Sequence, residues 1–89
     1  MFNANKKRLY KLIETDRYKN ANYRIEKVNG LFAIKEKSSG DYVDLCNGVH
    51  RWQYGSSYTS DCLGSLWRVL KIFDFCVPIV KPINVEMIY

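Results

Sequence analysis

The side chains in this chain that are best suited to chemistry are one histidine and three cysteines. His50 is the only histidine, so a general base or a Cys–His pair would have to use it. Cys46 and His50 flank an Asn-Gly turn, and Cys62 and Cys76 would complete a Cys₃His set of zinc-ligand types. Structural zinc sites usually bring their ligands as close pairs, whereas these last two cysteines stand alone. We therefore expect a structural histidine, no metal site and no cofactor.

Nothing else in the sequence assembles a catalytic site. The carboxylates Asp41, Asp44, Asp61 and Asp74 are scattered, with no pair placed for acid–base chemistry. The chain contains no G-x-x-x-x-G-K-[ST] phosphate loop, no G-x-G-x-x-G and no G-x-S-x-G. We accordingly expect a protein that is not an enzyme and that takes no small-molecule substrate.

The cysteines and the hydropathy of the sequence predict the cellular location of the protein. Three cysteines are an odd number without a C-x-x-C, which favours reduced, mostly buried thiols over a disulfide framework. Residues 1–8 carry charges with no apolar segment behind them, and the long apolar run of a transmembrane helix is missing. We expect a cytoplasmic protein without a membrane partner. Its richness in Lys, Asn, Ile and Tyr is typical of AT-rich genomes and hints at a phage or other mobile element.

Positive charge is concentrated at the N-terminus. The chain has a formal net charge of +5, and residues 1–19 contain six basic and only two acidic side chains. Four of the bases crowd a predicted helix, where bases in the first turn oppose the helix dipole: Lys6, Lys7, Arg8 and Lys11. This pattern predicts contact with nucleic acid or with an acidic protein surface. The alternative is a solvated helix face that only keeps the protein soluble.

A helix is predicted from about Asn3 to Thr15, within the basic element at 1–19. Asn3 or Asn5 would serve as its N-cap. The apolar positions fit a helical stripe: Leu9, Leu12 and Ile13. The polar residues 16–22 are predicted to form a loop.

Two Asn-Gly dipeptides organise the stretch 23–54 as an antiparallel sheet. Asn-Gly suits a two-residue type I′ turn, because both central positions need positive φ. A turn at Asn29-Gly30 would pair Val28 with Leu31 and Ile25 with Ile34. This pairing gathers Tyr23, Ile25, Phe32 and Ile34 on one face and Arg24, Glu26, Ala33 and Lys35 on the other.

A second hairpin is predicted around Asn47-Gly48. With a two-residue turn, Val43 would face Trp52 and Asp44 would form an ion pair with Arg51. The two hairpins together predict a four-stranded antiparallel meander with one apolar face and one solvated face.

Residues 61–74 are predicted to form the core helix. Apolar side chains recur there at helical spacing: Leu63, Leu66, Trp67, Leu70 and Phe73. Gly64 costs about 1 kcal/mol relative to Ala inside a helix, so a start at Ser65 is the alternative. A helix this apolar should lie across the apolar face of the sheet.

The last stretch, 76–89, is apolar and β-branched but is interrupted by Pro78 and Pro82. Proline donates no ladder hydrogen bond, so the stretch is predicted to be an edge strand or an extended arm. Apolar residues of this kind are expected to contact a protein partner or a second copy in a homodimer. The residues expected to make that contact are Ile79, Val80, Ile83, Val85, Ile88 and Tyr89.

The sequence thus predicts one small α+β domain spanning 1–89: helix, four-stranded meander, core helix and arm. It favours a small basic non-catalytic binding module. Such a module would be an accessory or inhibitor-type protein of bacterial or phage origin that binds a protein or a protein–nucleic-acid complex. One alternative is a sequence-independent DNA- or RNA-binding protein that uses the N-terminal helix. The other is a homodimeric structural protein.

Overall fold

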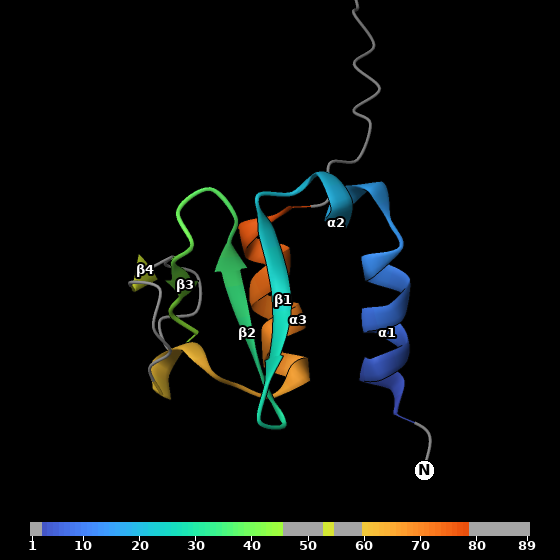
Figure 1. Cartoon of the computed structure of the whole chain (residues 1–89). Coiled ribbons are helices and arrows are strands. Elements are labelled where there is room, and N and C mark those ends of the chain that lie inside the picture. The colour runs from blue at the N-terminus through green and yellow to red at the C-terminus, as the bar shows by residue number, and fades with distance from the viewer. Residues whose placement is uncertain (1–2, 46–52, 55–59, 79–89) are drawn as a thin grey trace, which may run out of the picture.

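The computed structural model describes residues 3–45, 53–54 and 60–78. Two helices, α1 (Ala4–Ile13) and α2 (Asp16–Asn20), precede the strands β1 (Tyr23–Val28) and β2 (Leu31–Glu36). The short strands β3 (Tyr42–Val43) and β4 (Gln53–Tyr54), the 3₁₀ turn η1 (Ser60–Cys62) and the helix α3 (Leu66–Cys76) follow. Figure 1 shows α3 against one face of the antiparallel sheet, with α1 standing beside it. The α+β class, with an N-terminal helix, an antiparallel sheet and a C-terminal helix, is confirmed.

The first hairpin has the register that the alternation of its side chains predicts. Val28 lies opposite Leu31 and Ile25 lies opposite Ile34. Asn29 has φ 50° and Gly30 has φ 83°, so both central residues of the turn lie in the left-handed region. A type I′ turn needs this conformation at both positions, and its twist matches that of the flanking strands.

The register between β3 and β4 differs from the prediction. Tyr42 lies opposite Tyr54 and Val43 lies opposite Gln53, so the expected pairing of Val43 with Trp52 is wrong by one residue. A hairpin's register follows from its loop length, and the prediction assumed a two-residue turn. That turn, Asn47-Gly48, and Arg51 lie outside the described residues, so the second hairpin itself stays a prediction.

The main core lies between α3 and the sheet. Buried side chains of α3 meet buried side chains of the strands and of the segment that follows β3: Val69, Ile72 and Phe73 against Tyr23, Ile34, Val43 and Leu45. Each fully buried side chain of this kind contributes roughly 1.5–3 kcal/mol to the free energy of unfolding. The prediction that an apolar helix covers the apolar face of the sheet is confirmed.

The opposite face of the sheet is not simply solvated. Ala33, which was predicted there, is fully buried and forms a second cluster with Tyr42 and Cys62, against which Leu63 packs. Asp44 is also buried, at 1% exposed, rather than lying on a wet face. The expectation of a one-sided sheet is therefore wrong near β3. The segment at 60–63, distant in sequence, covers this part of the sheet.

The core helix begins later than residue 61. Ser65 is the N-cap of α3 and its side chain accepts a hydrogen bond from the Arg68 N–H at 3.3 Å. Gly64 instead pairs with Phe32 as an isolated bridge, and a Cβ there would lie 3.1 Å from Leu45 Cδ1. Glycine at 64 thus allows the chain to pass close to the sheet before the helix starts. Within the described ranges, no helix has both the length and the apolar character that crossing a membrane requires.

The predicted loop at 16–22 contains a short helix. Thr15 caps α2, because its hydroxyl accepts a hydrogen bond from the Tyr18 N–H at 3.2 Å. Only two residues, Glu14 and Thr15, therefore separate the end of α1 from the start of a second helix. The described part of the basic element contains two helices, and the prediction of a loop at 16–22 is wrong for residues 16–20.

Replacing Gly30 with Ala should lower the free energy of unfolding by about 1–2 kcal/mol, the cost of a left-handed conformation for a residue with a Cβ. A Cβ at this position would meet no atom within 4 Å, so backbone strain is the only local cost. Urea denaturation measures this change in the free energy of unfolding. Gly30→Asn is the matched control and should cost clearly less, because Asn tolerates this conformation. Equal losses in the two variants would contradict this explanation.

Candidate binding surface

The helix α1 is held by its cap and exposes its charges. The Asn3 side chain accepts hydrogen bonds from the N–H groups of Asn5 and Lys6, at 3.1 and 3.3 Å. These bonds satisfy two of the amide donors that a helix start leaves without partners. None of the ten residues of α1 is buried, and its first turn contains no acidic residue. The four predicted binding residues Lys6, Lys7, Arg8 and Lys11 are all exposed.

The structure does not place these four bases on a single face. Lys6 lines two hollows on the side of the β1–β2 hairpin. Arg8 and Lys11 line a separate hollow of about 310 Å³, together with Leu70 and Asp74 of α3. The hollow at Arg8 and Lys11 also contains Arg17 beside Asp74, whereas the larger of the two hollows at Lys6 has basic side chains and no acidic one in its described lining.

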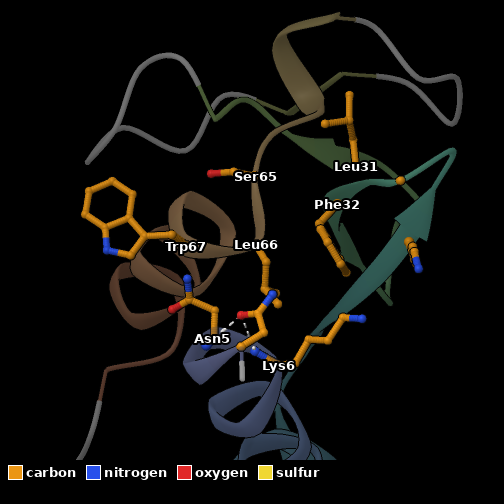
Figure 2. Close-up of a pocket in the computed structure, with 10 residues that line it drawn as sticks. Asn5, Lys6, Leu31, Phe32, Ser65, Leu66 and Trp67 are labelled. Atoms are coloured by element: carbon orange, nitrogen blue, oxygen red, sulfur yellow. Dashed lines mark hydrogen bonds between the residues drawn. The ribbon is translucent and has the colours of Figure 1, made fainter. Parts of the chain in front are cut away.

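The hollow of about 480 Å³ lies where three elements meet: the start of α1, the start of α3 and the turn of the first hairpin (Figure 2). Its basic side chains are Lys6 of α1 and Lys27 of β1. Asn3, Asn5 and Ser65 add polar groups to its lining, and none of the described residues around it is acidic. We call this space the basic hollow.

A second hollow of about 210 Å³ adjoins the basic hollow. Lys6, Lys27 and Phe32 line both spaces. Tyr10 and Glu26 also line the smaller hollow, and the Tyr10 side chain is 59% exposed. The groove between α1 and the hairpin therefore continues past Lys6 toward an exposed aromatic ring.

Trp67 at the rim of the basic hollow was missed as a surface residue. The sequence pattern counted it with the core stripe, but Trp67 is 54% exposed. Figure 2 shows its indole at the edge of the group of side chains that line the hollow. The Lys71 ammonium lies over its ring, 5.2 Å from the ring centroid, as a cation–π contact. The signal was present in the sequence: Lys71 and Asp74, four and seven positions further on, mark this side of α3 as polar.

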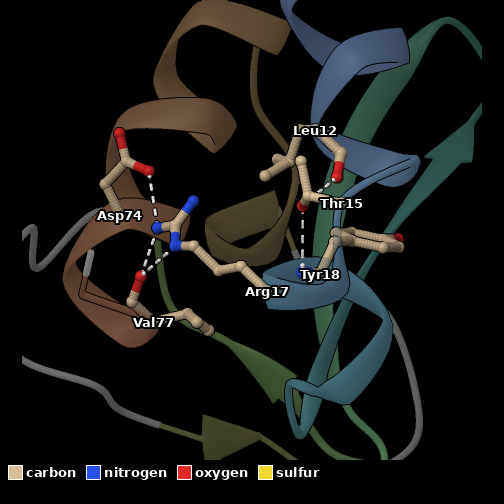
Figure 3. Close-up of polar contacts among 6 residues, drawn as sticks. All are labelled: Leu12, Thr15, Arg17, Tyr18, Asp74 and Val77. Carbon is tan, nitrogen blue, oxygen red and sulfur yellow. Dashed lines mark hydrogen bonds and ion pairs between the residues drawn. The ribbon is translucent and has the colours of Figure 1, made fainter. Parts of the chain in front are cut away.

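Arg17 is one of the basic residues at 1–19, but its side chain connects α2 to α3. Its guanidinium donates to the carbonyl oxygen of Val77 from both Nε and NH2, the Nε bond measuring 3.0 Å, and pairs with Asp74 at 2.9 Å (Figure 3). Val77 is the C-cap of α3, where carbonyl groups lack helical partners. Arg17 therefore joins α2 to the end of α3 and is not part of the binding surface.

Tyr18 of α2, which follows the basic helix, is also structural. Its hydroxyl accepts a hydrogen bond from the Ile25 N–H at 2.9 Å. Its ring packs on that of Phe73, with 5.5 Å between the centroids. Tyr10 of α1, in contrast, is 59% exposed. The side chains of Trp52, Tyr54 and Tyr58 lie outside the described residues.

Several predicted residues fall where the structure gives no description. The partner or dimer residues Ile79, Val80, Ile83, Val85, Ile88 and Tyr89 all do, as do Cys46 and His50. Cys62 is buried, as predicted, and Cys76 is half-buried. Within 3–45, 53–54 and 60–78, no three His, Cys, Asp or Glu side chains gather as a metal site would require.

Comparison of the chain with protein-family models, with curated proteins and with solved structures finds no match. Its function is therefore inferred from the placement of its own side chains.

Replacing Arg17 with Ala should lower the free energy of unfolding by about 1–3 kcal/mol, because it removes charged hydrogen bonds to a helix end. Arg17→Lys should lose most of the same stability, since an ammonium cannot reproduce the fork of donors. Thermal unfolding measures both variants. Asp74→Asn is the control: Asp74 is 47% exposed, and a surface ion pair contributes only about 0–1 kcal/mol. A loss in Asp74→Asn as large as in Arg17→Ala would assign the stability to the ion pair instead.

Proposed function

We propose that this protein is a non-catalytic binding module whose basic surface holds nucleic acid independently of its sequence. The observation on which this proposal mainly rests is α1: a ten-residue helix with no buried side chain and with four exposed bases. A helix that contributes so little to the core gives most of its surface to solvent or to a partner. Lysine and arginine contacts of this kind neutralise phosphates and do not read bases.

The basic hollow supports the same proposal. Lys27 comes from the sheet and Lys6 from α1, so two elements distant in sequence add positive charge to one concave surface. The described lining contains no acidic side chain to oppose a phosphate. A concave surface of one sign concentrates the field and attracts polyanions.

A protein partner is the second candidate, and exposed apolar side chains favour it. Leu31, Trp67 and Phe75 are 45%, 54% and 49% exposed. In this alternative the chain is an accessory or inhibitor-type protein of a bacterial or phage system. It meets a protein, or its own copy as a homodimer, through these residues and the apolar stretch of sequence that follows α3. Binding of this kind should depend little on salt.

The nucleic-acid proposal is tested by titrating the protein against labelled single- and double-stranded oligonucleotides at about 50 and 200 mM salt. If four phosphates are contacted, affinity should fall roughly a hundredfold between these two concentrations. The Lys6/Lys7/Arg8/Lys11→Ala variant should bind much more weakly at the lower salt. Fluorescence anisotropy measures the dissociation constants.

A charge-matched pair of variants locates the effect. Lys6→Ala/Lys27→Ala removes two charges at the basic hollow. Lys19→Ala/Lys37→Ala removes two exposed charges at α2, where the Lys37 ammonium donates to the Lys19 carbonyl at 3.3 Å. Lys6→Ala/Lys27→Ala should reduce the slope of log K against log salt concentration by about 2. Lys19→Ala/Lys37→Ala should leave this slope nearly unchanged. Equal effects would indicate net charge alone. No binding to either oligonucleotide at the lower salt would reject the proposal and direct the search to protein partners.

A further inference from the structure

Trp67 at the rim of the basic hollow is not among the buried side chains of the core. More than half of its side-chain surface is exposed, although burying a tryptophan is among the largest apolar gains available to a small core. We propose that Trp67 is a stacking platform for an unpaired base, so that the basic hollow binds single-stranded nucleic acid in preference to duplex. This inference rests on the nucleic-acid function proposed above.

The positive groups around Trp67 are arranged to contact several phosphates of a nucleic-acid strand and not a single anion. Lys71 lies over the indole, while Lys6 and Lys27 line the hollow that the indole borders. Because the bases of a single strand alternate with phosphates along the chain, a surface that holds it needs aromatic rings and cations side by side. The described residues of the rim provide both.

The concave shape favours a single strand over a duplex. In a duplex the base faces are covered by their neighbours, so an aromatic side chain meets a base only after the base leaves the stack. A single strand presents its bases freely and bends into a hollow bounded by two helix starts and a hairpin turn (Figure 2). The volume of about 480 Å³ lies within the usual range of roughly 300–1,000 Å³ for ligand sites.

The groove toward Tyr10 again combines lysine side chains with an aromatic ring. The smaller adjoining hollow shares Lys6 and Lys27 with the basic hollow and brings the exposed Tyr10 ring to its lining. Its described lining also contains Glu26, whose carboxylate accepts a hydrogen bond from Tyr42 Oη at 3.0 Å. We infer that a strand whose base stacks on Trp67 continues past Lys6 in the direction of Tyr10.

The test compares Trp67→Leu, which keeps an apolar side chain but removes the aromatic face, with Trp67→Phe, which keeps a smaller one. The probe is labelled oligothymidine of about twelve nucleotides, alongside a duplex of the same length. Trp67→Leu should bind oligothymidine roughly tenfold more weakly, and Trp67→Phe should retain most of the affinity. Duplex binding should change less than twofold in either variant.

Phe75→Leu is the matched control, because Phe75 is a similarly exposed aromatic residue of α3 that is not among the residues lining the hollow. It should leave both affinities unchanged. Circular dichroism verifies that each variant stays folded, which the exposure of both side chains favours. Oligothymidine binding that is equally strong in Trp67→Leu and in the parent protein would overturn the stacking role and leave the basic surface intact. A parent protein that binds neither probe would overturn the proposed function together with this inference.

Discussion

The position of α1, and with it the basic hollow, depends on how α2 is fastened to the end of α3. Phe73 is fully buried, and its ring meets the Tyr18 ring and the Arg17 guanidinium, at 5.5 and 5.4 Å between centres. Arg17 also holds the carbonyl of Val77, where α3 ends. Neither α1 nor α2 buries a residue completely, so the two helices rely on these contacts and on Leu12 packing at the edge of the main core. A few partly buried groups thus place a helix whose own core contribution is small.

This arrangement separates the stabilising groups of the domain from its exposed charges. The contacts of Arg17 and Tyr18 with Phe73 lie where α2 meets the end of α3. The basic hollow lies at the opposite ends of α1 and α3, as the course of the two helices in Figure 1 indicates. Near the start of α3, the Arg68 guanidinium also connects the helix to the segment after β3. Its Nε and NH2 groups donate to the Leu45 carbonyl at 3.0 and 2.7 Å. The helix starts and the hairpin turn are therefore held in a defined geometry before any partner binds, which lowers the ordering cost of binding.

Local patterns in the sequence predicted what depends on near neighbours. Asn29-Gly30 predicted a turn with two positive φ values, and helical spacing predicted the inner face of α3. Several failures come from contacts between distant residues. The helix α2 was predicted as a loop, although Thr15 caps it and Arg17 and Tyr18 anchor it on α3. Ala33 is buried because the segment at 60–63 covers it. Lys27 joins Lys6 only through the packing of α1 beside the hairpin, and no sequence period links the two residues.

The most direct measurement is a titration of ¹⁵N-labelled protein with oligothymidine, followed by amide and indole chemical shifts. If the basic hollow binds the strand, the largest changes should appear at Asn5, Lys6, Lys27 and the Trp67 indole N–H. The amides around Arg17 and Val77, at the far ends of the helices, should stay nearly constant. Changes concentrated instead around Phe75 and Val77, with Lys6 and Lys27 unaffected, would contradict a binding site at the basic hollow.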